Sequence, residues 1–209
     1  MRIGDRNIAD WGIVTGFKIN TPNVKKKTYD IPGRHGKIDA SEALTGYPIY
    51  DDRDIEIYVF VKEKTADEYQ RIYDDIFKFC HGKVEKIVFP FDSEYYYKGR
   101  LSVSVSQKDL YSATVTILAE CYPYALKENL TSVDISSITG EERTVQLLNS
   151  GMPTKLFIET NNDITIKRKN KISVYNGSTV IYEPLLIDDE EITVSGIAEA
   201  RIYYQEGKI

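Results

Sequence analysis

The chain has 209 residues, of which 42% are hydrophobic and 28% are charged, and its net charge is −5. This composition is typical of a globular protein of one or two domains, and no apolar run approaches the roughly 18 residues that a membrane-spanning helix needs. The negative charge lies in residues 128–209, because residues 1–127 are balanced, and an acidic half of this kind argues against nucleic-acid binding.

The N-terminal stretch MRIGDRNIADWGIV has charges where a signal peptide would have its apolar core. We therefore expect synthesis in the cytoplasm and no membrane insertion. Cys80 and Cys121 are too few for a disulfide framework and lack the CxxC spacing of redox or zinc motifs. Both are predicted to be buried, reduced thiols.

The first prominent motif along the chain is YDIPGRHGKID, which places an arginine and a histidine between two glycines. Proline fixes φ and the glycine after it supplies a conformation that other residues resist, so the Ile-Pro-Gly sequence predicts a turn. The second glycine permits another tight bend. The candidate turn or interface residues are Pro32, Gly33, Arg34, His35 and Gly36.

Phosphate binding and catalysis by this loop have less support in the sequence than a structural turn. A phosphate-binding loop ends in GK[ST], and this one does not. His35 would act as a general base if Asp39 oriented it and Ser41 supplied a nucleophile, but no GxSxG elbow accompanies them. The acidic clusters at 51–54 and 188–191 lack EF-hand spacing, and solvated turns account for both. We therefore expect no catalytic residue, no metal site and no cofactor.

The middle of the first half predicts strands and one helix. Apolar residues alternate with period 2 in DIEIYVFV, RLSVSVS and SATVTILAEC, which is typical of half-buried strands. Thr65 and Glu68 form a capping box, and apolar residues then recur at spacings of 3 and 4 until Gly82. His81, at the end of this helix, would meet the helix dipole as an imidazolium.

Beyond Lys127 the pattern indicates short strands, which suggests a compact β-sandwich of roughly 80 residues. Asn176-Gly177, between two β-branched runs, predicts a two-residue hairpin turn. The chain also has 16 tyrosines, a residue enriched at protein interfaces, although strand and core filling explains them equally well.

Several stretches follow one another in a characteristic order: DWGIVTG at 10–16, YDIPGRHGKIDASEALTG at 29–46, YDDRDIEIYVFV at 50–61, YYYKGRLSVSV at 95–105, CYPYA at 121–125, NSGMPTKLFIE at 149–159 and ARIYYQEGKI at 200–209. This ordered set resembles the distal tail protein family of siphophages over almost the whole chain.

The resemblance implies a mainly β fold: an N-terminal ring-forming β-sandwich with one α-helix and a projecting β-hairpin over residues 1–127, then a C-terminal galectin-like β-sandwich over 128–209. The turn motif would belong to the ring domain. The implied role is structural and not enzymatic: a ring, most often a hexamer, in the baseplate hub at the distal end of the virion tail. Its partners would be the tail tube protein, the tape measure protein and a tail-associated lysin or receptor-binding protein.

An alternative function is host-saccharide binding through the C-terminal domain. The short second half leaves no room for an inserted sugar-binding module, and no tryptophan follows Trp11, so we expect no independent glycan binding. A galectin-like fold does not by itself establish sugar binding. The tyrosines that would stack on a sugar ring are Tyr175, Tyr182, Tyr203 and Tyr204.

Overall fold

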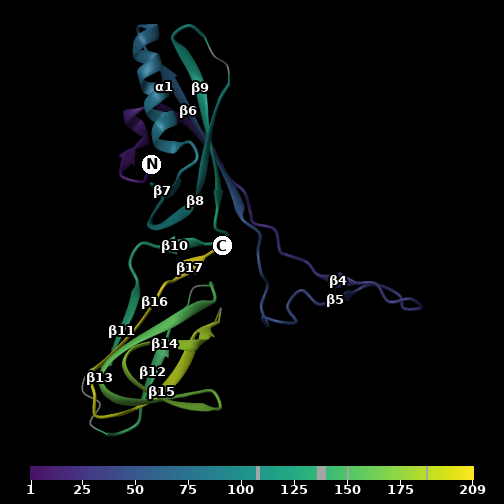
Figure 1. Ribbon diagram of the computed structural model, residues 1–209, viewed down its shortest axis with the longest axis vertical. Coiled ribbons are helices and arrows are strands. Elements are labelled where there is room, and N and C mark those ends of the chain that lie inside the picture. Colours follow the sequence, from purple (N-terminus) through teal and green to yellow (C-terminus); the bar gives the residue numbers. More distant parts are fainter. Residues whose placement is uncertain (107–108, 136–139, 150, 187) are drawn as a thin grey trace. The chain divides into compact units, whose positions relative to one another are not determined.

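The structure is a computed structural model that describes residues 1–106, 109–135, 140–149, 151–186 and 188–209 (Figure 1). The chain divides into two compact units, Met1–Pro123 and Tyr124–Ile209, each with its own hydrophobic core. The described residues are mostly β-strand with one α-helix, so the expected mainly β fold class is confirmed. Lys127, where the charge pattern breaks, lies in the second unit, because its strand β10 (Ala125–Lys127) pairs with β17 (Gly207–Lys208).

The first unit is built on antiparallel strands in the order β2-β1-β7-β8-β9-β6-β3. Their bounds are β1 Arg2–Ile3, β2 Arg6–Asn7, β3 Ile13–Ile19, β6 Arg53–Lys62, β7 Val84–Phe89, β8 Asp92–Ser106 and β9 Ser112–Cys121. Phe17 of β3 contacts Phe89 of β7, with ring centroids 4.9 Å apart, although β8, β9 and β6 lie between these strands in the sheet. The sheet therefore folds over itself and encloses a core.

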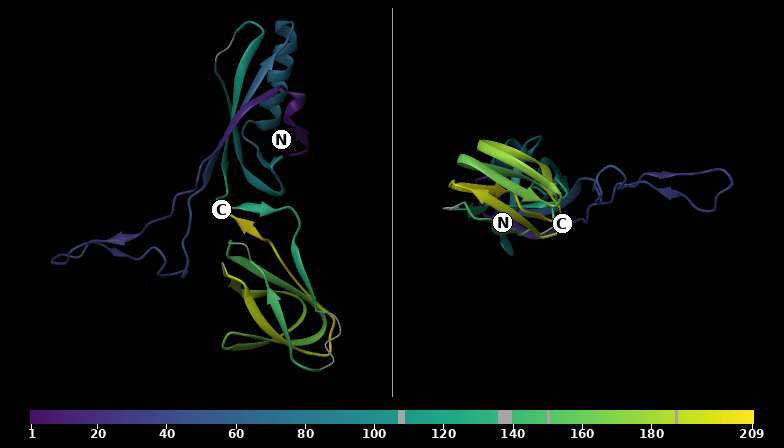
Figure 2. Two further views of the ribbon diagram at one scale, coloured as in Figure 1. Left: turned by 180° about the vertical axis from the view of Figure 1, so that it is seen from behind. Right: turned by 90° about the horizontal axis from the view of Figure 1, so that it is seen from below.

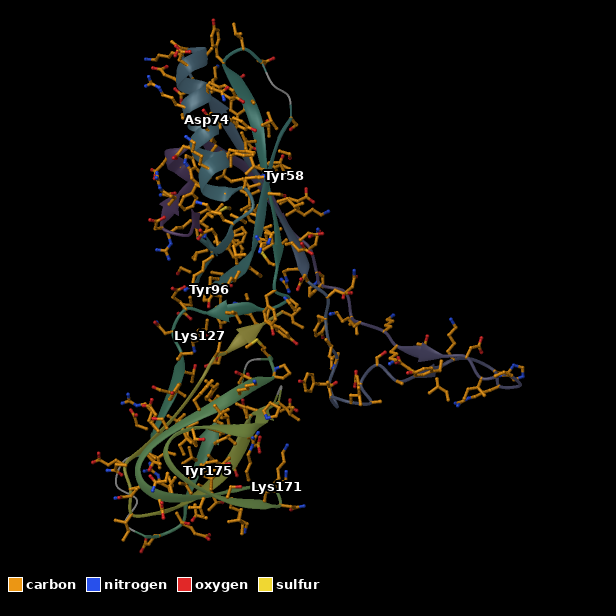
Figure 3. The ribbon with its side chains drawn as sticks, in the orientation of Figure 1. Tyr58, Asp74, Tyr96, Lys127, Lys171 and Tyr175 are labelled. Carbon is orange, nitrogen blue, oxygen red and sulfur yellow. The ribbon has the colours of Figure 1, made fainter. Side chains whose placement is uncertain are left out.

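The centre of this core is formed by the apolar residues that were predicted to alternate along β6 and β9. The side chains of β6 that fall in the apolar phase are all fully buried, as are those of β9. The register places Ile57 opposite Ile117 and Val59 opposite Val115, so the two apolar rows lie on the same face. Tyr58, on the reverse face, is half-buried (Figure 3).

The helix α1 (Ala66–Cys80) covers this face, and its predicted capping box is confirmed at the N-terminal end. The Thr65 hydroxyl accepts a hydrogen bond from the Glu68 N–H at 3.2 Å. Tyr69, Ile76 and Cys80 are buried against the sheet. The short 3₁₀ helix η1 (Ile8–Asp10) precedes Trp11, whose indole N–H donates to the Asp75 carboxylate of α1 at 2.7 Å.

Two predictions concern single residues near α1. Cys80 and Cys121 are buried and unpaired, and burial raises the pKa of each thiol to about 12, so both are inert. His81 does end the helix, but its Nδ1 accepts the Val103 N–H at 3.1 Å. His81 thus joins the end of α1 to the backbone of β8.

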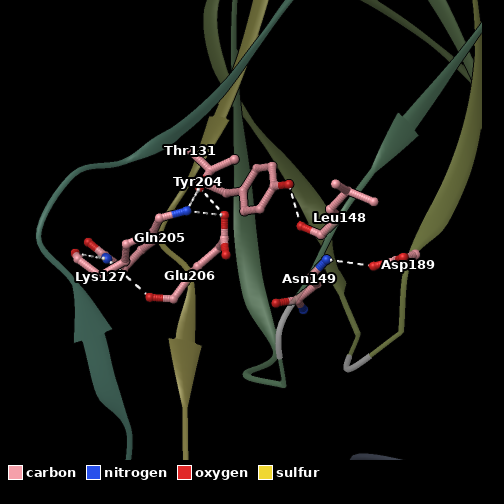
Figure 4. A network of polar contacts seen from close by, with 8 residues as sticks. All are labelled: Lys127, Thr131, Leu148, Asn149, Asp189, Tyr204, Gln205 and Glu206. Carbon is pink, nitrogen blue, oxygen red and sulfur yellow. Dashed lines mark hydrogen bonds and ion pairs between the residues drawn. The ribbon is translucent and has the colours of Figure 1, made fainter. Parts of the chain in front are cut away.

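The second unit has strands in the order β11-β16-β13-β15-β12, with β14 paired to β13. The bounds are β11 Thr131–Ile135, β12 Arg143–Leu147, β13 Thr154–Arg168, β14 Lys171–Leu185, β15 Glu190–Gly196 and β16 Ala200–Tyr204. β13 and β14 are longer than the short strands expected from the sequence. Its core is aliphatic apart from Tyr204, whose hydroxyl donates to the Leu148 carbonyl (Figure 4).

The hairpin turn predicted at Asn176-Gly177 is wrong. Both residues lie inside β14, and the turn that joins β13 to β14 is Lys169–Asn170, where Lys169 has φ +52°. Gly177 does have a positive φ, +69°, but it sits where residues 161–163 of β13 bulge opposite Asn176. A bulge requires the same backbone freedom as a turn, which is why the Asn-Gly signal is ambiguous.

Polar contacts join the start of the second unit to residues 205–206, which connect β16 to β17 (Figure 4). The Lys127 ammonium lies 3.0 Å from the largely buried Glu206 carboxylate, which also accepts the Thr131 hydroxyl. The Gln205 amide donates to the Lys127 carbonyl at 2.6 Å. These contacts close the unit around its own chain ends.

We predict that Gly99→Ala destabilises the first unit by about 1–3 kcal/mol, because its new methyl group would lie 2.6 Å from the Cys121 Cα and force β8 away from β9. Gly16→Ala is the matched control, since its methyl group would meet its nearest neighbour, in Tyr58, at an ordinary 3.7 Å. Chemical denaturation of both variants measures the difference, and equal stabilities would show that the close approach is unimportant.

The separate cores predict that each unit folds alone, with the boundary at 123/124 instead of the 127/128 boundary expected from the sequence. Fragments 1–123 and 124–209 are each expected to show strand-rich circular dichroism and one cooperative thermal transition. An unfolded or aggregated 124–209 fragment would contradict this boundary.

Candidate interaction surfaces

The first candidate surface is the 20–52 insertion, which connects β3 to β6 (Figure 2). Its two ends are held by backbone hydrogen bonds: the Lys25 N–H donates to the Ile49 carbonyl at 2.7 Å, and the Asp51 N–H donates to the Asn23 carbonyl at 2.8 Å. Further along, β4 (Thr28–Tyr29) pairs with β5 (Ile38–Asp39), which forms the expected hairpin.

The sequence motif Pro32–Gly36 lies between these two strands. The Arg34 N–H donates to the Ile31 carbonyl at 3.1 Å, and Gly33 has φ +84°, the geometry of a type II turn with proline and glycine at its centre. Gly36 also has a positive φ, +74°. Arg34 and His35 are exposed, and a Cβ added at either glycine would meet nothing within 4 Å. The motif thus displays the side chains of Arg34 and His35 on an open turn.

Asp39 and Ser41, which the sequence offered as partners of His35 in a catalytic triad, contact each other directly. The Ser41 hydroxyl donates directly to the Asp39 carboxylate at 2.5 Å, and the Ser41 N–H donates to the same oxygen at 2.9 Å. In a catalytic triad the histidine stands between these two groups. Ser41 also accepts the Lys27 N–H at 2.8 Å, so Asp39 and Ser41 connect the two chains of the hairpin.

Several large apolar side chains of the insertion are exposed. Leu44 is 98% exposed. The other exposed apolar residues of the insertion are Val24, Tyr29, Ile31 and Ile49. A two-stranded hairpin is only marginally stable in water, and a set of exposed apolar groups marks an interaction surface.

The second candidate surface is the outward face of the sheet in the second unit. Cross-strand register aligns four polar residues in one row, Asp134, Arg201, Glu159 and Ser178, from β11, β16, β13 and β14. The adjacent row contains Tyr203 opposite Phe157, whose rings stack with centroids 5.4 Å apart. Polar residues around the first row line a groove of about 710 Å³.

The groove residues restrain one another. The Arg201 guanidinium donates to the Asp134 carboxylate at 2.5 Å, and this contact raises the pKa of Arg201. The Tyr203 hydroxyl donates to Glu159 at 3.2 Å, and burial together with this hydrogen bond raises the pKa of the phenol. At one end of the groove, Asn161 exchanges two hydrogen bonds with the backbone of Glu199.

Among the tyrosines considered for stacking on a sugar, Tyr203 lies on the outward face of the sheet beside Phe157. Tyr204 is fully buried and Tyr175 packs partly against the core. The side chain of Tyr182 lies outside the described residues. Sequence reasoning did not find Phe157, Glu159 or Arg201, because their phase places them outward but gives no sign of which strands become neighbours.

The acidic cluster at 188–191 has structural roles. Asp189 accepts the Asn149 N–H at 2.9 Å, and Glu190 pairs with the buried guanidinium of Arg168 at 2.6 Å. Within the described residues, no group of three or more histidines, cysteines and acidic residues is placed to hold a metal ion. No helix in the same residues is long and apolar enough to cross a membrane.

Comparison with solved structures shows the fold. The chain is similar to the crystal structure of the Dit (gp 19.1) protein of phage SPP1, described as a paradigm of the hub adsorption apparatus in phages that infect Gram-positive bacteria. The TM-score is 0.72 and the sequence identity 12%, and the match covers 99% of this chain and 98% of the Dit chain. The Dit-like fold implied by the sequence motifs is confirmed.

A de novo designed double-stranded β-helix is also similar, with a TM-score of 0.26 and 17% identity over 38% of this chain and 99% of that one. No protein-family model matches the chain, and no curated protein matches it.

The contacts of Asp39 generate a prediction about pH. Hydrogen bonds from Ser41 lower the pKa of Asp39, so their contribution to hairpin order is present above the ordinary pKa and is lost as the pH falls through the lowered one. Ser41→Ala should raise the pKa of Asp39 towards its ordinary value, as measured by carbon-13 NMR of the carboxyl group. Asp30, in the same insertion, is the internal control; an unchanged Asp39 titration would refute the contact.

Proposed function

We propose that the chain is a structural protein of a phage tail tip: a distal tail protein whose copies form a closed ring, most simply a hexamer, at the distal end of the tail. The Dit-like fold over the full length supports this role. The ring would join the tail tube protein and the tape measure protein to a tail-associated lysin or a receptor-binding protein. Its place would be the virion tail, after synthesis in the bacterial host cytoplasm.

The observation that carries the proposal is the 20–52 insertion. Its backbone is ordered by hydrogen bonds at its ends and at β4–β5, yet its apolar side chains are exposed. Burial of these side chains against a neighbouring copy would recover roughly 25 cal/mol for each Å² of apolar surface. Arg34 and His35, on the open turn, would face that neighbour.

A closed ring satisfies the geometry of such a contact. An insertion that reaches from one copy to the next makes a head-to-tail interface, and rotational closure uses every interface without leaving open ends. The balanced charge of residues 1–127 adds no strong self-repulsion to this association. The fold does not by itself establish the role, because one fold serves many functions.

The test compares the full chain with a variant in which residues 26–48 are replaced by Asn-Gly. The hydrogen bond between Lys25 and Ile49 places these residues close enough for a two-residue turn to join them. Light scattering and negative-stain images should show a ring for the full chain and a monomer for the variant, because the variant lacks the proposed contact surface. Both should have the same thermal stability if the insertion does not support the core.

Glu142→Gln, an exposed change in the second unit, is the control and should keep the ring. The measurement is repeated with the protein products of the neighbouring genes, in case the ring closes on a partner. A full chain that stays monomeric under both conditions would contradict the connector role.

A further inference from the structure

We propose that the outer edge of β14, at residues 171–175, binds an extended acidic segment of another protein, which adds one strand to the sheet. This interaction goes beyond the connector role and does not depend on it. In the described part of the chain, β14 pairs with β13 and with no other strand, so one side of its backbone lacks a strand neighbour. A peptide that aligns along such an edge gains main-chain hydrogen bonds.

Two apolar side chains stand exposed on this edge, which begins at Lys171 (Figure 3). Ile172 is 69% exposed and Val174 is 63% exposed. They lie two residues apart and so share the outward face of the sheet, whereas Tyr175 lies on the other face and packs against the core. Free edges are commonly protected by charges, by proline or by short strands. Exposed β-branched residues offer instead a contact for alternate side chains of an added strand.

The neighbouring residues on the same face are polar, so the apolar strip is confined to the edge strand. Cross-strand register continues the rows of Ile172 and Val174 through β13 to β15. The residues at these positions are Lys167, Thr193, Thr165 and Ser195. A strip confined to an edge matches the contact surface of one added strand and not a broad interface between two globular proteins.

Positive charge collects at the turn where this edge begins. Residues 128–209 are acidic overall, yet half of their lysines and arginines lie in 167–171. Arg168 is buried in an ion pair, whereas Lys167 and Lys169 are exposed. Among the described residues, the ion pairs include neither of these two lysines. Electrostatic complementarity therefore favours a segment that carries carboxylates.

A second copy of this chain is a poor donor of such a strand. Of its two acidic clusters, 51–54 continues into β6, which pairs with β3 and β9. The other, 188–191, continues into β15, which pairs with β12 and β13. Release of either cluster would break strand pairing inside its own unit. The donor is therefore a different protein with an acidic, extended segment.

The test is a peptide array that presents short, capped peptides to the full-length protein and varies their charge and their strand propensity. Acidic, neutral and basic sets are each made with β-branched residues, and again with a central proline, which removes a backbone donor. We expect saturable binding of the acidic β-branched set. The best peptide is then titrated by fluorescence anisotropy, and its affinity should fall as the salt concentration rises.

The double change Ile172→Thr/Val174→Thr removes apolar surface and keeps β-branched side chains. It should weaken peptide binding about fivefold, and Lys167→Gln should weaken it about threefold, as expected for two cross-strand pairs and one exposed ion pair. Lys155→Gln, which removes another exposed lysine of β13, is the matched control and should bind like the parent. Thermal unfolding of all variants separates lost binding from lost folding.

The proposal is overturned if no peptide binds, if basic or proline-containing peptides bind as well as the acidic β-branched set, or if the edge variants bind like Lys155→Gln. Inorganic polyphosphate that binds as tightly as the best peptide would also overturn it, because a polyanion adds no strand. Light scattering is measured on the same samples. An oligomer lost in Ile172→Thr/Val174→Thr would show that a second copy occupies the edge, whereas a ring that persists while peptide binding is lost shows that the two proposals are independent.

Discussion

The pairing of β6 with β9 is the interaction on which the first unit depends. Each strand buries every second side chain completely, and the register places the two apolar rows on one face. This apolar face is covered by α1, which packs Tyr69, Ile76 and Cys80 against it. Because β3 occupies the edge beside β6, the chain can leave the sheet between these two strands without interrupting the core. The 20–52 insertion is tolerated at this edge for that reason.

Burial of every second side chain also shapes the second unit. Alternation along β13 and β16 buries Ile158 and Ile202, and therefore directs the residues between them outward. Those outward residues are not simple solvated charges. They pair across the strands into one polar and one aromatic row, and a groove lies at the polar row. The unit thus combines an aliphatic core with an outer face of specific chemistry.

Local patterns in the sequence were sufficient for part of this structure. The capping box at Thr65 and the phases of β6 and β9 each depend on neighbouring residues, so both could be predicted. Asn176-Gly177 was misassigned because a bulge and a turn require the same positive φ. The hydrogen bond from the Val103 N–H to the His81 ring joins residues 22 positions apart, so it could not be predicted from local pattern. The groove joins Asp134, Glu159 and Arg201 from three strands, and such long-range register is not readable from one sequence.

We propose that the chain is a component of the tail tip. Gold-labelled antibodies against the full chain, applied to tail-bearing particles from the strain that carries its gene, test this location most directly by electron microscopy. We expect label confined to the distal end of the tail. Label along the tube, label on the capsid, or particles without any label would contradict it.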